Sequence, residues 1–196
     1  MKYLIVGLGN PGDEYLNTRH NVGYMVLDAF AKASNTVFQD KRYGFVGRMQ
    51  IKNRKLVLLK PTTYMNLSGN SVRYWLNKEK IEIERLLIVT DDLALPIGTI
   101  RLKGKGGDGG HNGLRNIIQT LSTQNFARLR VGIGNNFNIG AQVKFVLDEF
   151  STNEIDLINK LITVATDVIK SFCLSGLTDT MTIYNKRDRN YYGDQD

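Results

Sequence analysis

Residues 7–23 read GLGNPGDEYLNTRHNVG and follow an apolar run at residues 2–6 that is typical of a buried strand. The glycines spell G-x-G-x-x-G, the pattern of a dinucleotide-binding loop, in which the third glycine lies in the first turn of a helix. In this chain the apolar helical pattern starts only at Asn21, and Pro11 removes one backbone N–H from the loop. The stretch therefore predicts a strand, a long polar loop and a helix, with pyrophosphate binding as the weaker alternative.

The rest of the chain continues this alternation of strand and helix patterns. Strands are expected over residues 45–51, 55–59, 85–89, 99–102 and 128–133. Helices are expected over residues 21–32, 66–76, 114–121 and 151–184, the last with a break near Ser175 and Gly176. Such alternation predicts an α/β fold of three layers, in which helices flank a twisted, mostly parallel central sheet. The hairpin pattern at residues 45–59 makes the predicted sheet mixed.

Length and composition favour one domain in a reducing compartment. The chain has 196 residues, enough to bury a core without disulfides, and we expect a single domain over residues 1–186 with a flexible tail over residues 187–196. A single cysteine, Cys173, cannot form a disulfide within the chain, and the N-terminus lacks a signal-peptide pattern. Because no apolar run approaches the ~18 residues of a membrane span, we expect a cytoplasmic protein that does not enter the membrane.

Positive charge gathers in one part of the chain. Lysine and arginine total 26 against 19 acidic residues, a formal net charge of +7. Between residues 101 and 130 a single acid, Asp108, accompanies six cations: Arg101, Lys103, Lys105, Arg115, Arg128 and Arg130. A local cluster of this kind favours contact with nucleic-acid phosphates over a merely solvated positive face. Only one aromatic residue, Phe126, lies within this stretch, so phosphate contact is expected rather than base stacking.

Polar residues gather in loops that we expect at one edge of the sheet, because ligands of α/β sheets bind beyond the carboxyl ends of the strands. Four loops are candidates for this edge: residues 7–12, 61–69, 91–98 and 104–113. Their polar residues, together with His20 just after the first loop, are Asn10, Asn66, Asp91, Asp92, His111 and Asn112. The sequence therefore predicts a polar site built from several loops.

The two histidines of the chain, His20 and His111, indicate acid–base chemistry at that edge. A neutral imidazole can take a proton from water near neutral pH, and a carboxylate on its other nitrogen fixes the tautomer. Asp91 and Asp92 end a predicted strand and are candidates for that carboxylate. No G-x-S-x-G elbow supplies a serine nucleophile. The chain also has no His-x-x-x-His or Cys-x-x-Cys spacing, so a zinc site is the weaker alternative and we expect no metal or other cofactor.

Three asparagines, Asn10, Asn66 and Asn112, adjoin glycine or Ser-Gly in these loops. Turn formation and helix capping explain such residues one at a time. A carboxamide also offers a donor and an acceptor together, which complements a peptide unit or a developing oxyanion. The residues alone therefore favour a hydrolase whose base is His20, whose pocket binds amide groups and whose rim binds a phosphate-bearing partner. A dinucleotide-dependent oxidoreductase and a non-enzymatic RNA-binding module are the alternatives.

Six segments together give the chain a resemblance to a known family. In chain order they are GLGNPGDEYLNTRHNVG, PTTYMNLSG, DDLALPIGTIRLK, GGDGGHNGL, FARLRVGIG and FVLDEF. This set resembles the bacterial peptidyl-tRNA hydrolases. The resemblance implies a monomeric α/β enzyme without a cofactor, which hydrolyses the ester between a peptide and the 3′ end of tRNA.

The resemblance also implies roles for individual residues. His20 would be the base that activates water, and Asp91 would orient His20. The substrate would be bound by Asn10, Asn66, His111, Asn112 and Tyr15, the last of them near the tRNA 3′ end. The tRNA phosphate would be bound by Lys103, Lys105 and Arg130. Two positions depart from the family pattern, since Thr90 stands where histidine is usual and Ala94 where an acid is usual, which puts in doubt only the local hydrogen bonding of that loop.

Overall fold

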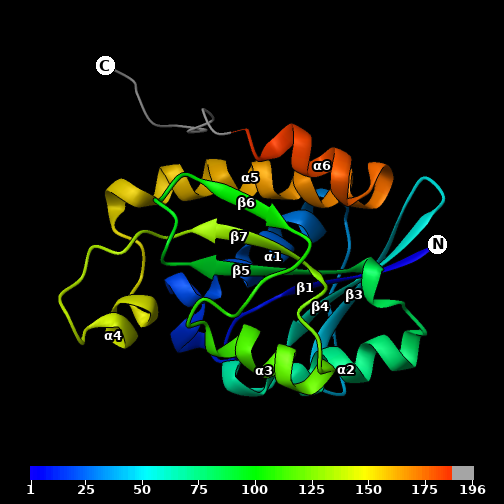
Figure 1. Cartoon of the computed structure of the whole chain (residues 1–196), viewed down its shortest axis with the longest axis horizontal. Helices are drawn as coiled ribbons and strands as arrows, with labels where there is room; N and C mark the ends of the chain where they lie inside the picture. Colours follow the sequence, from blue (N-terminus) through cyan, green and yellow to red (C-terminus); the bar gives the residue numbers. More distant parts are fainter. Residues whose placement is uncertain (187–196) are drawn as a thin grey trace.

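A mixed sheet of seven strands forms the centre of residues 1–186, the part of the chain that the computed structural model describes (Figure 1). The strands are β1 (Lys2–Gly7), β2 (Gln39–Lys41), β3 (Gly44–Ile51), β4 (Arg54–Pro61), β5 (Leu86–Asp92), β6 (Ile100–Lys103) and β7 (Ala127–Gly132). Their order in space is β2-β3-β4-β1-β5-β7-β6. Strands β4, β1, β5 and β7 are parallel neighbours, whereas β3 runs antiparallel to β2 and β4, and β6 antiparallel to β7. The predicted mixed, mostly parallel sheet is confirmed.

Helices cover both faces of this sheet and produce the predicted three layers (Figure 1). One face carries α1 (Val22–Ala33), α5 (Thr152–Ser175) and α6 (Leu177–Tyr184), and the other carries α2 (Ser68–Glu79) and α3 (Asn112–Leu121). Each face has its own buried cluster, with Phe30 and Leu161 in the first and Trp75 and Phe126 in the second. Burial of such side chains stabilises the layers by roughly 25 cal/mol for each Å² of apolar surface.

Two glycines of the opening stretch allow α1 to pack closely against β1. A Cβ atom on Gly7 would lie 2.2 Å from the carbonyl oxygen of Gly23, and one on Gly23 would lie 2.5 Å from the backbone nitrogen of Leu8. Two short 3-10 helices, Asp13–Tyr15 and Arg19–Asn21, separate the glycine loop from α1. A pyrophosphate site requires a helix N-terminus directly after the loop glycines, and α1 does not begin there. These glycines serve the packing of helix on strand.

The loop after β6 follows a path that the sequence predicted only in part. Because β6 runs antiparallel to β7, the loop starts at the opposite edge of the sheet, where Lys103 pairs with Arg128 near the start of β7. Arg128 holds the loop there, since its guanidinium donates to two loop carbonyl oxygens at 2.6 and 2.9 Å. The chain then returns to the carboxyl edge, where His111 precedes α3. Only the second half of residues 104–113 therefore lies at the predicted edge.

Two elements, β2 and the short helix α4 (Gln142–Leu147), were not predicted. The three residues of β2 are exposed and polar, so they show no apolar alternation. Helix α4 is too short to show a helical period, and it lies beyond the carboxyl edge of the sheet (Figure 1). Within residues 1–186, no helix combines the length and the apolar character needed to cross a bilayer. The predicted tail, residues 187–196, lies outside the described part of the chain.

Candidate active site

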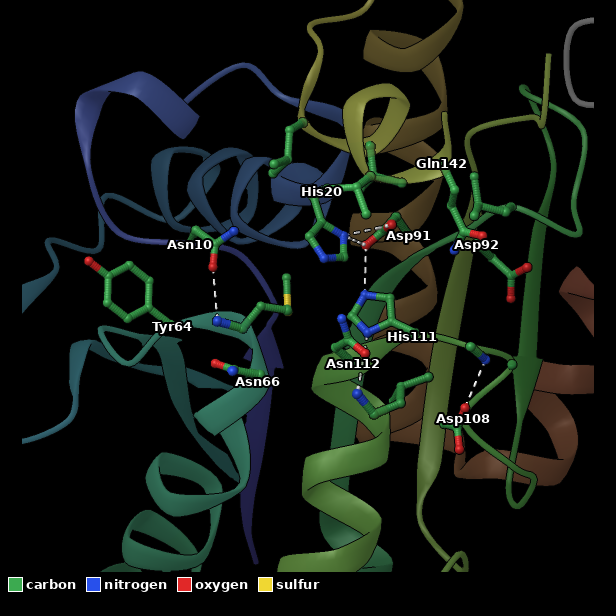
Figure 2. A pocket seen from close by; sticks show the side chains of 18 residues that line it. Asn10, His20, Tyr64, Asn66, Asp91, Asp92, Asp108, His111, Asn112 and Gln142 are labelled. Carbon is green, nitrogen blue, oxygen red and sulfur yellow. Dashed lines mark hydrogen bonds and ion pairs between the residues drawn. The ribbon is translucent and has the colours of Figure 1, made fainter. Parts of the chain in front are cut away.

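A cavity of about 410 Å³ opens beyond the carboxyl ends of β1, β4 and β5 (Figure 2). Its polar lining residues are Asn10, His20, Tyr64, Asn66, Asp91, Asp92, Asp108, His111, Asn112 and Gln142. Its apolar wall includes Val143, Val146 and Leu147 of α4. The loops converge here because the carboxyl ends of parallel strands share one edge. The cavity thus brings together all seven polar residues that the sequence predicted at this edge: Asn10, His20, Asn66, Asp91, Asp92, His111 and Asn112.

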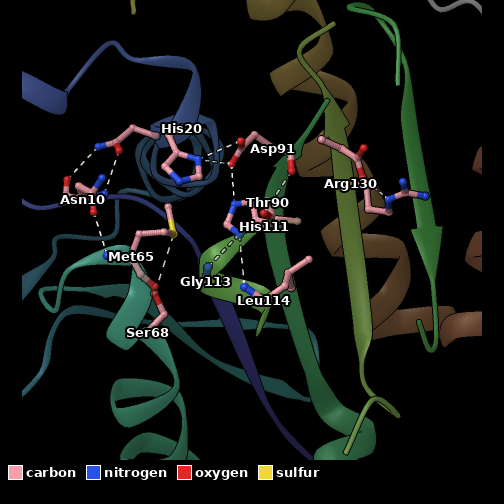
Figure 3. A network of polar contacts seen from close by, with 12 residues as sticks. Asn10, His20, Met65, Ser68, Thr90, Asp91, His111, Gly113, Leu114 and Arg130 are labelled. Carbon is pink, nitrogen blue, oxygen red and sulfur yellow. Dashed lines mark hydrogen bonds and ion pairs between the residues drawn. The ribbon is translucent and has the colours of Figure 1, made fainter. Parts of the chain in front are cut away.

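The carboxylate of Asp91 lies between the two histidines and contacts both (Figure 3). Nδ1 of His20 lies 2.9 Å from Oδ2 and 3.0 Å from Oδ1 of Asp91. Nε2 of His111 lies 2.8 Å from Oδ1 of the same carboxylate. Asp91 sits at the end of β5 and is only 3% exposed, so its carboxylate depends on these partners in place of water.

The backbone of α3 determines which nitrogen of His111 carries the proton. Nδ1 of His111 accepts hydrogen bonds from the backbone N–H groups of Gly113 and Leu114, at 3.1 and 3.3 Å. That nitrogen is therefore unprotonated, and Nε2 carries the hydrogen that it donates to Asp91. An imidazole here caps the helix N-terminus, a position more often taken by serine, threonine, aspartate or asparagine. The result is a fixed donor that orients the Asp91 carboxylate.

Asp91 in turn fixes the tautomer of His20. An ionised carboxylate only accepts hydrogen bonds, so Nδ1 of His20 donates and Nε2 is left with a lone pair. Among residues 1–186, Nε2 of His20 has no hydrogen-bond partner. Since His20 also lines the cavity, this nitrogen is available to a water molecule bound there.

The electrostatics of the pair favour a charged carboxylate beside a basic imidazole. Burial by itself would lower the pKa of His20, but the charge and the hydrogen bond of Asp91 outweigh it, so the net pKa lies above the ordinary value of 6.5. For Asp91, burial by itself would raise the pKa, but the two imidazoles reverse this effect and hold its pKa well below the usual range. Asp91 is therefore ionised, and it stabilises the imidazolium that forms when His20 takes a proton.

The same three residues are of the types that bind metal ions, and one donor atom of each lies within 4.8 Å of the others. A ligating imidazole nitrogen must be unprotonated. The His111 nitrogen that faces Asp91 carries a proton, because its other nitrogen accepts two backbone N–H groups. The donor atoms also contact one another at hydrogen-bonding distances of 2.8 and 2.9 Å. The residues therefore fit a hydrogen-bonded triad better than a metal site.

Asn10 lies on the side of His20 away from Asp91, and hydrogen bonds fix its position (Figure 3). Its backbone N–H and carbonyl form two hydrogen bonds with the side chain of Asn21, each at 2.9 Å. Its own Oδ1 accepts the backbone N–H of Met65 at 2.9 Å, so the NH₂ group is left for the cavity. Asn21 was not predicted from the sequence, although it is fully buried and directly follows His20. The buried side chain of Asn21 therefore holds the backbone of Asn10. Because Asn21 directly follows His20, these hydrogen bonds fix Asn10 and His20 relative to each other.

The other substrate-binding candidates occupy different positions. Asn66 lies in the turn after β4, and Asn112 opens α3, where its Oδ1 accepts a hydrogen bond from Arg115 at 3.0 Å. Both line the cavity. Tyr15 is not among the lining residues, whereas Tyr64, 64% exposed, is. Sequence reasoning missed Tyr64, although it lies in the PTTYMNLSG segment beside Asn66.

The predicted phosphate contacts lie outside the cavity, on β6, on β7 and in the loop after β6. Lys103 and Arg130 are diagonal neighbours on these paired strands, which places their Cα atoms roughly 7–8 Å apart. Nε of Arg130 donates to the Asp92 carboxylate, and its two terminal nitrogens have no partner among residues 1–186. Lys105 is exposed in the loop after β6. Asp92 also lines the cavity, so this basic surface adjoins the site.

Arg19, which directly precedes His20, fastens α4 to the site. Its guanidinium donates to the carbonyl oxygen of Glu149 at 2.7 Å and pairs with the Glu154 carboxylate at 2.8 Å. The same group stacks over the ring of Phe145 in α4, 4.3 Å from the ring centre. These contacts of Arg19 connect α4, which forms one wall of the cavity, to the segment that carries His20. No local signal predicts these contacts, because the partners lie more than 120 positions away in the sequence.

Comparison with known proteins identifies the family of this chain. Residues 4–191 match the family model described as Peptidyl-tRNA hydrolase. The chain belongs to the peptidyl-tRNA hydrolase family. A relative from Phocaeicola vulgatus named "Peptidyl-tRNA hydrolase" is 60% identical over 187 residues, which cover 95% of this chain and 100% of the relative. One of the same name from Porphyromonas gingivalis is 54% identical over 185 residues, covering 94% and 100%.

A solved structure supports the peptidyl-tRNA hydrolase assignment at the level of the fold. The crystal structure of peptidyl-tRNA hydrolase from Acinetobacter baumannii has a TM-score of 0.87 and 38% sequence identity, with 92% of each chain covered. The two departures of the present chain, Thr90 and Ala94, do not line the cavity. Thr90 is fully buried and donates to the carbonyl oxygen of Asp91 at 3.3 Å, and the Ala94 N–H donates to Asp92 at 2.8 Å. The loop thus forms its own hydrogen bonds without the side chains usual at these positions.

Proposed function

We propose that this chain hydrolyses the ester bond between the peptide and the tRNA of peptidyl-tRNA, with a water activated by His20 and without a covalent intermediate. The observation that carries the proposal is the lone pair of His20 Nε2 at the cavity, while Nδ1 of the same ring donates to the Asp91 carboxylate at 2.9 Å. That pairing is the arrangement a general base requires. Membership of the peptidyl-tRNA hydrolase family supplies the substrate class.

In the proposed reaction, Nε2 of His20 takes a proton from water while the water oxygen attacks the ester carbonyl carbon. The carbonyl oxygen becomes an oxyanion, and the NH₂ group of Asn10 is the donor placed to stabilise it. The tetrahedral intermediate then expels the ribose oxygen, which receives the proton from the His20 imidazolium. Among residues 1–186, Tyr64 is the only hydroxyl-bearing residue that lines the cavity, and no cysteine or lysine does. This composition supports direct attack by water.

The carboxamides of Asn10, Asn66 and Asn112 suit the peptide part of the substrate. Asn66 offers a donor and an acceptor, whereas Asn10 and Asn112 offer their NH₂ groups, because their Oδ1 atoms already accept from Met65 and Arg115. Together they complement the backbone groups of a peptide of any sequence. Lys103, Lys105 and Arg130 suit the tRNA part, because cations outside the cavity can hold phosphate while the ester lies at His20. We expect the enzyme to be monomeric, with a single domain over residues 1–186.

The substrate class is tested with two forms of one aminoacyl-tRNA. We expect hydrolysis of the form whose amino group is acetylated and sparing of the unblocked form, because a free α-ammonium group replaces the amide that the asparagines bind. Release of labelled amino acid from each form is the measurement. A chain that binds tRNA but cleaves neither form would be an RNA-binding module and not this enzyme. Equal cleavage of both forms would contradict amide recognition.

The phosphate contacts are tested by their salt dependence. Replacing Lys103 and Arg130 by alanine should raise KM with little change in kcat, since neither side chain lines the cavity. Each phosphate contact contributes ~0.7–0.9 to the slope of log affinity against log salt concentration, so the double variant should show a smaller slope. The measurement is KM at several salt concentrations. A slope equal to that of the parent would count against both residues as phosphate ligands.

A further inference from the structure

A second pocket, of about 380 Å³, lies between α2 and the β2–β3 hairpin, at the sheet edge farthest from β6. Three cations line it, namely Lys41, Arg48 and Lys78. The other polar lining groups are Gln39 and the only tryptophan of the chain, Trp75. Among residues 1–186, no carboxylate lines this pocket. Its lining therefore consists of donors and positive charge around an aromatic floor.

Neighbouring side chains order two of the three cations. The ammonium group of Lys78 lies 4.8 Å from the ring centre of Trp75 and donates to the Tyr74 hydroxyl at 3.4 Å. The indole N–H of Trp75 is itself bonded to the carbonyl oxygen of Arg42 at 3.0 Å, so the floor is fixed. Arg48 donates to the Glu79 carboxylate at 2.6 Å. An anion entering the pocket would thus meet partly ordered donors, which reduces the entropy lost on binding.

Glu79 does not cancel this positive charge. The hydrogen bond from Arg48 is the largest of several effects that lower its pKa, to about 2, and its other oxygen pairs with Lys2 at 2.8 Å. Two cations therefore face one carboxylate. Asp40 lies between two pocket residues of β2, and its side chain points to the other face because side chains alternate along a strand. The pocket keeps a net positive charge, which attracts anions.

The pocket and the basic surface on β6 and β7 lie on the same face of the sheet. Val46, two residues before Arg48, shares a buried cluster with Phe126, and the Arg128 guanidinium stacks 4.2 Å from the ring centre of Phe126. Arg130 is two residues further along β7 and so points to that face as well. Four strand spacings of ~4.8 Å separate β3 from β7, about 19 Å in all. Because α2 and α3 cover the sheet between the two places, an RNA stem that contacts both would pass over these helices.

We propose that this pocket binds a phosphate group of an RNA backbone and gives the protein a second contact to its tRNA, separate from Lys103 and Arg130. Lysine and arginine donors with an amide side chain are the groups that bind backbone phosphates in protein–nucleic acid complexes. The proposal rests on the proposed function in one respect, namely that tRNA is the RNA presented. The ligand chemistry itself depends only on the lining of the pocket.

The first test compares tRNA binding by two matched double variants. In Lys41→Gln with Lys78→Gln we expect the Kd for deacylated tRNA to rise about tenfold, and the salt slope of log Kd to fall by ~0.7–0.9, the value of one phosphate contact. The control is Lys32→Gln with Lys55→Gln, which removes the same charge from two exposed lysines away from the pocket. The control should keep the Kd and the slope of the parent. Pocket and control variants that behave alike would overturn the proposal.

The second test uses the fluorescence of Trp75, which reports on this pocket alone because the chain has no other tryptophan. Titration of the parent with deacylated tRNA should change the emission, and the pocket variant should show no change. Inorganic phosphate is the probe for a small ligand. A response to phosphate without any effect of the variant on tRNA binding would identify a free-phosphate site and overturn the RNA assignment.

Failure of the proposed function gives a different result. At saturating N-acetylated aminoacyl-tRNA, the kcat of the pocket variant should equal that of the parent, because the pocket lies apart from the cavity at His20. If the parent itself fails to hydrolyse the ester, the proposed function is wrong, while the binding comparison remains valid. If the parent is active and the pocket variant binds tRNA as the parent does, the inference about the pocket is wrong.

Discussion

Replacing His20 with alanine is expected to lower the kcat for N-acetylated aminoacyl-tRNA by ~10²–10⁴-fold, the usual contribution of a general base. The variant loses the only imidazole nitrogen that faces the cavity with a lone pair, because Nδ1 of His111 is engaged by the backbone of α3. A base acts in the transition state and not in binding, so kcat and kcat/KM should fall together. Deacylated tRNA should bind with unchanged Kd, since Lys103 and Arg130 lie outside the cavity.

Single-turnover hydrolysis and equilibrium binding separate these two effects. Thermal unfolding of the variant checks that the fold survives the loss of the ring. Free imidazole in the assay should restore part of the turnover, because the space of the deleted ring opens on the cavity. If the alanine variant turned over at close to the parental rate, the assignment of His20 as base would be rejected, whatever the other residues do.

The main parts of the site could be predicted because they depend on local features of the sequence. Asp91 ends a strongly apolar strand pattern, so its place at the carboxyl edge follows from the run before it. His20 and Asn10 lie in the loop between the first strand and the first helix, and Asn66 lies just after another parallel strand. In a parallel sheet these positions meet at one edge. The alternation of strands and helices was enough to bring the groups together.

The missing parts depend on contacts between distant residues. The proton on Nε2 of His111 is determined by backbone N–H groups of α3, and the sequence gives no sign that a histidine caps this helix. The role of Arg19 depends on carbonyl oxygens near α4, and that of Asn21 on the backbone of Asn10. The direction of β6 decides where its following loop begins, and a four-residue strand carries no information about direction. Local patterns identify such residues without identifying their partners.

One buried carboxylate with two imidazole partners has a consequence for reactivity. Oδ1 of Asp91 accepts from both His111 and His20, at 2.8 and 3.0 Å. The N–H of His111 therefore interacts with the same negative charge that raises the pKa of His20. It also prevents the carboxylate from rotating away, because its own direction is fixed by α3. His111 is thus a positioning residue in this proposal, and its effect on the reaction passes through Asp91.

Replacing Asp91 with asparagine should reduce kcat by up to ~10⁴-fold, because a carboxamide in this place favours the wrong tautomer of the base. The fixed Nε2–H of His111 requires an oxygen at the Oδ1 position. The NH₂ group then takes the Oδ2 position, 2.9 Å from Nδ1 of His20. If Nδ1 accepts from that group, the proton of the neutral ring lies on Nε2, where the base needs its lone pair. The backbone and the cavity change little, so binding of deacylated tRNA should persist.

The pH dependence of kcat/KM distinguishes this tautomer effect from simple disruption of the site. In the parent, the pKa of His20 lies above 6.5 through Asp91, and only the neutral ring is active, so activity should fall as the pH drops below that raised value. In Asp91→Asn the charge is gone while burial still lowers the pKa of His20, so the acid limb should move to lower pH. Asp92→Asn removes a neighbouring charge without touching His20 and should leave the limb in place. An acid limb that stays put in Asp91→Asn, or shifts equally in both variants, would mean that Asp91 does not set the protonation of His20.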